Sequence, residues 1–297
     1  MIGPGMPPPL ILDFDGSVLP VSEDECRLSL GEWQEAIRFG CTFAACARLE
    51  SHLHGKLPEA YGCAFTGSGD YHHLSLLLLR GLARRRGPAA PPLTLVVCDN
   101  HPDNMRYPFG LHCGSWVRHA AALAAVAHIH VLGITSGDIT ARHAWENYLS
   151  PFWRKKLTYW SIGRGAGWLR LLGWGEYGRR FDSPGALVDA FLPVLRKAGE
   201  VYLSLDKDVF SPELVRTNWD QGVFELDHAA AIMTGCRDKL AGADITGDIS
   251  DYAYTGRLKR LLSRLDGQTT LTPEEISGSQ VVQRELNRRL LGLLEGK

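Results

Sequence analysis

Short apolar runs alternate along this chain with longer stretches of helical pattern. The longer stretches include LSLLLLRGLARRR at 74–86 and SPGALVDAFLPVLRKAG at 183–199, the second with a Ser-Pro start and a Gly stop. Strands that alternate with helices predict a mostly parallel sheet, because parallel strands are joined by crossovers that cover its faces. We therefore predict an α/β fold in three layers, α/β/α, with a mostly parallel, doubly wound sheet. The predicted strands cover residues 10–14, 62–67, 93–99, 129–135 and 201–206.

The length and charge of the chain limit the classes of protein to which it can belong. With 297 residues, 45% of them hydrophobic, it can bury a large core, and we expect a single domain over residues 1–297. The 32 basic and 33 acidic residues leave a net charge of -1, which gives no electrostatic reason to expect nucleic acid or a membrane as partner. Seven cysteines without a CxxC pattern favour a reducing compartment, so we expect a cytoplasmic protein.

Two segments stand apart from the alternation of strands and helices. Residues 1–9, MIGPGMPPP, are rich in proline and glycine, and we expect a loose tail. Residues 150–182 interleave four tryptophans with arginines and glycines, and we interpret them as an aromatic-rich insertion or lid. The nearly neutral chain argues against a surface there that stacks nucleic-acid bases.

Clusters of carboxylate and imidazole groups follow three of the predicted strands. Ligands of parallel sheets gather beyond the carboxyl ends of the strands, and residues two apart on an extended segment point the same way. The clusters therefore aim several charged side chains into one space. They are GDYHH with His72 and His73, DNHPD with Asp99, His101 and Asp103, and SLDKD with Asp206 and Asp208.

This combination of side chains predicts a metal site. Carboxylates packed together without a cation raise one another's pKa, which makes such a cluster unfavourable on its own. Mixed carboxylate and imidazole ligation suits Mn²⁺, Zn²⁺, Fe²⁺ or Ni²⁺. The side chains outnumber the ligands that one ion needs, so we expect two bridged divalent ions.

The three clusters, in this order, resemble the ureohydrolase (arginase/agmatinase) family, whose pattern is GGDHS, then DAHxD, then SxDxD. GDYHH matches the first motif with one extra residue, which places His72 at the ligand histidine; DNHPDN matches the second and SLDKDVFSP the third. Two weaker matches are GLHCGSW at 110–116, similar to the segment of the family's catalytic histidine, and VLGITSGD at 131–138. The resemblance covers roughly residues 60–250 and is specific as a set of motifs.

The resemblance implies an arginase-like fold, a small-molecule substrate and two divalent ions, with Mn²⁺ the first expectation and Zn, Fe or Ni as alternatives; a homo-oligomer is left open. It implies that one ion is held by His72, Asp99, Asp103 and Asp206. It implies that the other is held by His101, Asp99, Asp206 and Asp208. A hydroxide between the ions would attack a C–N bond of a guanidine, amidine or amide. Asp103 would orient this hydroxide, and His112 would pass a proton to the leaving amine.

The chain departs from the family pattern where the substrate is expected to bind. Gly247 stands where the family has a glutamate that grips a guanidinium, and Asp248 follows it. The sequence VRTNWDQGVF at 215–224 replaces the family's glycine-rich loop. We therefore expect Asp248, Trp219 and Asp220 to contribute to substrate binding, and we expect L-arginine and agmatine to be poor substrates.

Other functions remain open at this point. The pair His72 and His73 is similar to the twin histidines of deacetylase-like amidohydrolases, which use one zinc ion, although Asp103 and Asp208 favour two ions. ILDFDGSVLP at 11–20 is similar to the start of haloacid-dehalogenase-type phosphatases, with Asp13 as nucleophile and Asp15 as general acid. That reading leaves the three clusters unexplained, so we interpret ILDFDGSVLP as a first strand with a polar end. A non-catalytic, metal-stabilised binding module would need a damaged site, and no ligand is missing.

Overall fold

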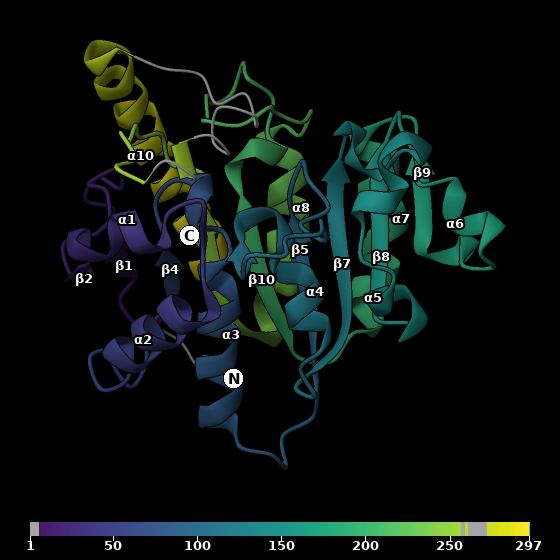
Figure 1. Cartoon of the computed structure of the whole chain (residues 1–297), viewed down its shortest axis with the longest axis horizontal. Helices are drawn as coiled ribbons and strands as arrows, with labels where there is room; N and C mark the ends of the chain where they lie inside the picture. Colours follow the sequence, from purple (N-terminus) through teal and green to yellow (C-terminus); the bar gives the residue numbers. More distant parts are fainter. Residues whose placement is uncertain (1–5, 257–258, 261–271, 297) are drawn as a thin grey trace.

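A nine-stranded sheet runs through the computed structural model, which describes residues 6–256, 259–260 and 272–296 (Figure 1). Neighbouring strands pair in parallel, in the order β2-β1-β4-β11-β10-β5-β7-β8-β9. The strands are β1 Leu10–Asp13, β2 Cys26–Ser29, β4 Cys63–Phe65, β5 Leu93–Cys98, β7 Val126–Ile134, β8 Leu157–Ile162, β9 Gly178–Phe181, β10 Val201–Asp206 and β11 Leu240–Thr246. All five strands predicted from the sequence are present, and the parallel sheet is confirmed.

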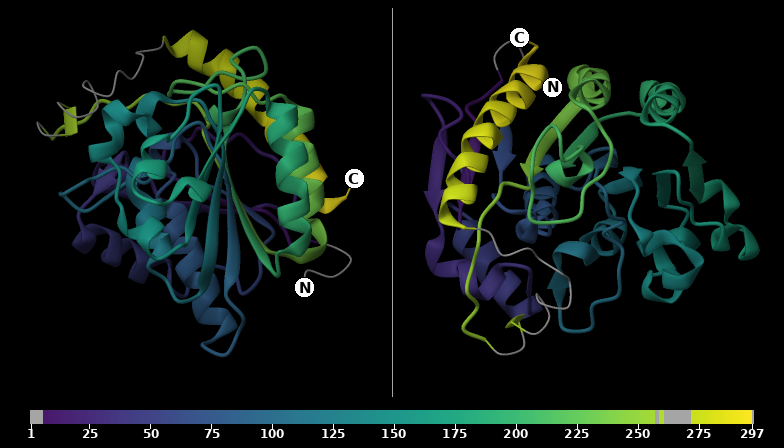
Figure 2. Two further views of the ribbon diagram at one scale, coloured as in Figure 1. Left: turned by 90° about the vertical axis from the view of Figure 1, so that its right-hand side faces the viewer. Right: turned by 90° about the horizontal axis from the view of Figure 1, so that it is seen from above.

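Helices cover both faces of the sheet, which gives the predicted three layers (Figure 2). One face packs against α2 Phe43–Leu53, α3 Leu74–Arg86 and α4 Trp116–Ala121, with the short helices α1 Gln34–Ile37, α5 Ser150–Trp153 and α6 Trp168–Leu171 on the same side. The other face packs against α7 Pro184–Lys197, α8 Leu226–Cys236 and α10 Pro273–Glu295.

Strand β5 shows why its sequence is apolar throughout. Leu95 and Val97 belong to the core beneath α3 and α4, whereas Val96 and Cys98 belong to the core beneath α7 and α8. Successive side chains of a strand point to opposite faces, so a strand covered on both sides needs apolar residues at every position.

Local capping signals fix the ends of the long helices. Ser183 caps α7 by accepting a hydrogen bond from the Ala186 backbone N–H, and proline follows at the first helical position. Thr272 and Glu275 form a reciprocal capping box at the start of α10. Among the described residues, no helix combines the length and apolar character that crossing a membrane requires.

Residues 150–182, interpreted from the sequence as an insertion or lid, supply β8 and β9 at one edge of the sheet. Trp160 on β8 is fully buried, and Trp168 on α6 is 7% exposed, whereas Trp153 is 78% exposed. Most of these aromatic side chains therefore pack into the protein. Residues 1–5 of the expected loose tail lie outside the described residues.

The centre of the sheet positions the candidate site. Strands β4, β11, β10 and β5 are neighbours, and their carboxyl ends share one edge. A small antiparallel pair, β3 Gly40–Cys41 and β6 Leu111–His112, lies outside this sheet and carries His112. The three clusters found in the sequence follow β4, β5 and β10, so the topology brings them together.

Candidate metal centre

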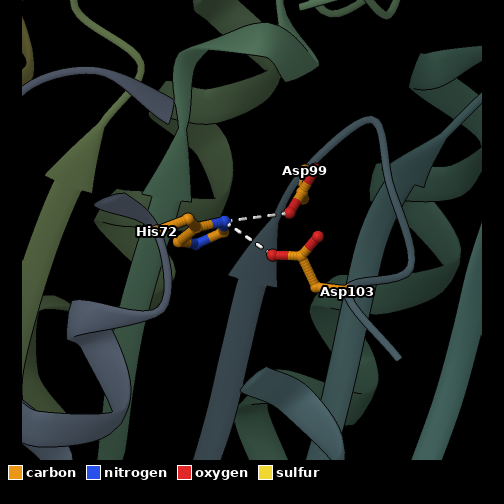
Figure 3. Close-up of side chains that lie close together, drawn as sticks. All are labelled: His72, Asp99 and Asp103. Carbon is orange, nitrogen blue, oxygen red and sulfur yellow. Dashed lines mark ion pairs between the residues drawn. The ribbon is translucent and has the colours of Figure 1, made fainter. Parts of the chain in front are cut away.

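The first group of candidate ligands surrounds His72, which follows the 3-10 helix η2, Gly69–Tyr71, between β4 and α3. The ring is 2% exposed, and its Nδ1 lies 3.2 Å from Asp99 Oδ2 and 2.8 Å from Asp103 Oδ2 (Figure 3). Asp206 Oδ2 is 3.4 Å from the same nitrogen. One imidazole nitrogen therefore faces three carboxylates.

The second group surrounds His101. Its Nδ1 lies 2.8 Å from Asp208 Oδ2 and 3.6 Å from Asp99 Oδ1. In each group, three potential ligand atoms lie within 4.8 Å of one another: His72, Asp99 and Asp103 in the first, and Asp99, His101 and Asp208 in the second. Asp99 belongs to both groups, as expected of a carboxylate that bridges two ions.

A network of buried side chains orients His72 from behind. Its Nε2 lies 3.0 Å from Ser204 Oγ, and Ser204 donates a hydrogen bond of 2.7 Å to Asp244 Oδ1. Ser75 and Tyr202 also donate to the Asp244 carboxylate, at 2.8 and 2.6 Å. When Nε2–H donates to Ser204, the proton is fixed on that nitrogen and Nδ1 remains free to bind a metal.

Close backbone packing at Gly247 supports Asp206. Gly247 has a φ of +93°, and a Cβ built there would lie 2.6 Å from Asp206 Oδ1 and 2.8 Å from the Lys207 backbone nitrogen. Any larger residue would need both a strained backbone and a displaced carboxylate. A glycine at position 247 is therefore required by this arrangement.

The crowded carboxylates perturb one another. Burial and the charge of Asp99 raise the pKa of Asp103 to about 7, and the same two causes raise the pKa of Asp208 to about 7. Burial and the charge of Asp208 raise the pKa of Asp206 well above its usual range. Burial alone would lower the pKa of His72, but Asp103 and Asp99 raise it. The excess of negative charge in the cluster therefore favours the binding of cations, either protons or metal ions.

Two divalent cations fit this donor set. Four carboxylates would be neutralised by two such ions, and the two imidazoles provide one nitrogen ligand to each group. The raised pKa values of Asp103, Asp206 and Asp208 show that these carboxylates repel one another when no cation lies between them. The residues present are therefore suited to divalent metal ions.

His112 lies on β6 in the wall of the same site. Its Nδ1 accepts a hydrogen bond of 3.0 Å from the Gly114 backbone N–H, which leaves the ring proton on Nε2. Burial, together with the positive charge of Lys259, lowers the pKa of His112 to about 3. The ring is therefore neutral at pH 7 and can donate a hydrogen bond through its Nε2–H.

A cavity of about 470 Å³ opens over the cluster. It is lined by all six candidate ligands, and His112, Trp219 and Asp220 also line it. Asp138 and Glu146 add two carboxylates, and Arg106 adds a positive charge. Such a concave site with convergent polar groups is suited to a small molecule.

Comparisons with known proteins agree with the fold. No family model matches the chain. A relative from Thermotoga maritima, an uncharacterized protein, is 26% identical over 240 residues, which is 80% of this chain and 78% of the relative. The proclavaminate amidino hydrolase of Streptomyces clavuligerus superposes with a TM-score of 0.57 at 19% identity, over 99% of this chain and 93% of that one.

Two further solved structures have the same architecture. The formimidoylglutamase of Bacillus subtilis superposes with a TM-score of 0.55 at 12% identity, over 98% of this chain and 86% of that one. The arginase of Entamoeba histolytica superposes with a TM-score of 0.52 at 14% identity, over 98% of this chain and 99% of that one. The chain has the ureohydrolase fold.

Within this ureohydrolase fold, Asp248 does not reach the cavity, which corrects the expectation that it binds substrate. Asp248 is fully buried, its Oδ2 lies 2.8 Å from Lys207 Nζ, and its Oδ1 accepts a hydrogen bond of 3.0 Å from Asn287 Nδ2. These two contacts hold the carboxylate among buried residues that do not line the cavity.

Asp220 lines the cavity, but its contacts assign it a different role from the one expected. Its Oδ1 lies 2.7 Å from His101 Nε2, and Asn100 Nδ2 donates to Oδ2 at 3.2 Å. The carboxylate therefore orients His101 from behind, as Ser204 does for His72.

Replacing Asp220 with asparagine is expected to weaken Mn²⁺ binding by about tenfold, because the His101 ring loses its charged partner. Equilibrium dialysis against Mn²⁺ measures the change. Asp182→Asn is the matched control, since the Asp182 side chain is 97% exposed and lies outside the cavity. Unchanged affinity in Asp220→Asn would contradict the assignment.

The N-terminal motif is separate from the cavity. Asp13 pairs with Arg27 at 3.0 Å, whereas Asp15 lies 3.5 Å from the buried Arg38 and accepts a hydrogen bond of 2.6 Å from Ser250. Neither aspartate is among the residues that line the cavity. The structure therefore gives no support to a phosphatase site at Asp13 and Asp15.

Sequence reasoning missed the residues that orient the ligands. Ser204 and Asp244 are polar residues inside otherwise apolar strands, and this contrast was the available signal. Trp116, the last residue of the GLHCGSW segment, donates from Nε1 to Asp103 Oδ2 at 2.6 Å, but only His112 of that segment was predicted to act in the site. Asp103 itself has a φ of +46°, a conformation that is uncommon for residues other than glycine.

Proposed function

We propose that this chain is a binuclear metal-dependent hydrolase that cleaves a C–N bond of a guanidine, amidine or amide. The observation that carries the proposal is the shared carboxylate of Asp99, which joins two compact groups of ligand atoms. When bound, two divalent ions lower the pKa of water and polarise the group under attack. Manganese is the first candidate, and the formiminoglutamase of Trypanosoma cruzi, which shares the fold, was solved with Mn²⁺.

The residues of the chain divide the remaining work. His72, Asp99, Asp103 and Asp206 hold one ion, and Asp99, His101, Asp206 and Asp208 hold the other. The ring of His112 lines the cavity, and its Nε2–H can donate a hydrogen bond to the leaving nitrogen, which takes its proton from the attacking water. Trp116 and His72 both contact Asp103 Oδ2, so that carboxylate is held in place to orient the attacking group.

The substrate differs from L-arginine and agmatine. An enzyme specific for a guanidinium is expected to present a carboxylate beside the hydrolysed group, because that cation donates several hydrogen bonds from one plane. At the position where the family has its glutamate, Gly247 cannot supply one, and the neighbouring Asp248 is held by Lys207 and Asn287. The proteins that share the fold include an amidino hydrolase and a formimidoylglutamase, which supports a C–N substrate of another kind.

A single-zinc, deacetylase-like site is the weaker alternative. A single zinc ion would not need both Asp103 and Asp208 as ligands. Each of these carboxylates nevertheless lies 2.8 Å from a histidine nitrogen of the cluster. His73 is fully buried and is not among the residues that line the cavity.

The test is a screen of metal-reconstituted protein against guanidino, amidine, formimidoyl and acyl-amine compounds, scored for urea, ammonia or amine release. We expect release from at least one compound that is neither L-arginine nor agmatine. Asp13→Asn is the control, and we expect it to keep turnover within about threefold, since Asp13 lies outside the cavity. Efficient hydrolysis of L-arginine, or phosphatase activity that Asp13→Asn abolishes, would contradict the proposal.

A further inference from the structure

An arc of aromatic rings forms one wall of the cavity. The ring of Tyr107 stacks on that of His112, with centroids 4.8 Å apart, and His112 meets Phe39 edge-on at 4.3 Å. Phe39 and Trp219 lie parallel within 3°, with centroids 6.2 Å apart, and Trp219 lies 6.0 Å from His101. All five rings line the cavity. This aromatic arc therefore runs from the candidate proton donor to a candidate metal ligand.

Phe39 is held in the arc with a backbone conformation that bulky residues rarely adopt. Its φ is +67°, which is rare for a bulky residue, and its side chain is 1% exposed. The Phe39 backbone N–H donates to Asp70 O at 2.9 Å, and its carbonyl accepts from the Cys113 N–H at 3.0 Å. The preceding Arg38 is 2.6 Å from Asp70 Oδ2 and fixes the same segment. Strain retained by such a framework is typical of residues in functional sites.

Trp219 is fitted closely to the metal-binding turn. A Cβ built on Gly69 would lie 2.9 Å from Trp219 Cδ1, so the indole rests directly on that glycine. The buried Nε1–H of Trp219 has no hydrogen-bond acceptor among the described residues. The loop that carries Trp219 therefore places a large ring beside the metal-binding turn.

The cavity also contains one free anionic group. The Asp138 carboxylate lines it and has no hydrogen-bond or ion-pair partner among the residues that the structure describes. A carboxylate and aromatic faces together favour a weakly hydrated cation or a planar polar group attached to a ring. They are poorly suited to a long aliphatic amine with a hydrated charge.

We infer that the substrates of the proposed hydrolase are aromatic or conjugated C–N compounds, in which the amidine or amide is attached directly to a planar group. The aromatic arc would pack against that group, and Trp219, which the buried Phe39 supports by stacking, would determine specificity. This inference rests on the proposed function for the reaction, but the recognition of a planar group can be measured without turnover.

The test compares benzamidine with acetamidine, two amidines that differ in the aromatic ring, by isothermal titration calorimetry on the manganese-loaded protein. We expect benzamidine to bind at least about tenfold more tightly than acetamidine. Trp219→Ala should reduce this ratio to about twofold or less while acetamidine affinity is retained, whereas Trp219→Phe should keep most of the ratio.

Two controls separate specificity from folding. Trp153→Ala removes a tryptophan that is 78% exposed and outside the cavity, and it should leave the ratio unchanged. Phe39→Leu provides a second variant of the arc and should also lower the ratio. Each variant is used only after its manganese content matches that of the unmodified protein.

Equal binding of the two amidines, no binding of either, or a ratio that survives Trp219→Ala would overturn the inference. A ratio that depends on Trp219 in a protein that hydrolyses no C–N compound would uphold the inference and reject the proposed function. Hydrolysis with no preference for planar compounds would uphold the proposed function and reject the inference.

Discussion

Replacing Asp99 with alanine is expected to remove both metal ions from the protein and to abolish turnover. Asp99 is the only residue common to the two groups of ligand atoms found among the described residues, and it is 1% exposed. Its Oδ2 faces His72 and its Oδ1 faces His101, so each proposed ion loses a ligand when the side chain is truncated.

Asp208→Ala is the matched variant, because Asp208 belongs to the His101 group alone. We expect this protein to keep the ion beside His72 and to lose the other. Elemental analysis after reconstitution and dialysis gives the metal content of each variant, and circular dichroism confirms that the fold is kept. An Asp99→Ala protein that still holds two ions per chain would show that the ligands are wrongly assigned.

Replacing Lys207 with methionine is expected to destabilise the protein by about 3 kcal/mol, because a buried carboxylate loses its cation. Lys207 and Asp248 are both fully buried, and their charged atoms lie 2.8 Å apart. Asn287 on α10 accepts from Lys207 and donates to Asp248, each at 3.0 Å. The pair therefore ties the turn between Asp206 and Asp208 to the C-terminal helix.

Urea unfolding of three variants tests this expectation. The double variant Lys207→Met with Asp248→Leu removes both charges, so it should recover most of the stability that the single variant loses. Arg289→Met breaks an exposed pair, with side chains 59% and 60% exposed, and should change the free energy of unfolding by less than about 1 kcal/mol. A single variant as stable as the parent would show that the pair does not stabilise this region.

The main ligands could be predicted because they follow strand ends. Each cluster comes directly after a strong apolar strand, and a parallel sheet places the carboxyl ends of neighbouring strands together. The sequence therefore predicted which elements meet without knowledge of their exact geometry. Because β4, β10 and β5 lie close together at the centre of the sheet, the residues that follow them, His72, Asp206 and Asp99, come within contact distance.

Contacts that depend on strand register could not be predicted. Ser204 and Asp244 are paired in the register of β10 and β11, and a shift of one residue would have separated them. Asp248 shows the same dependence, since its direction follows from its position relative to Gly247. Asp220 reaches His101 through an irregular loop, and no periodic pattern in the sequence encodes such a conformation.

The edges of the sheet were also missed, for a different reason. The strand Cys26–Ser29 is only half-buried, and Gly178–Phe181 carries two exposed arginines. Edge strands do not need apolar residues on both faces, so they lack the pattern that revealed the central strands.

Anomalous diffraction from crystals of manganese-loaded protein tests the binuclear site most directly. We predict two manganese peaks about 3.5–4 Å apart, one beside His72 and Asp103 and the other beside His101 and Asp208, with Asp99 between them. A single peak at one histidine, or ions bound elsewhere in the protein, would contradict the assignment of a binuclear centre.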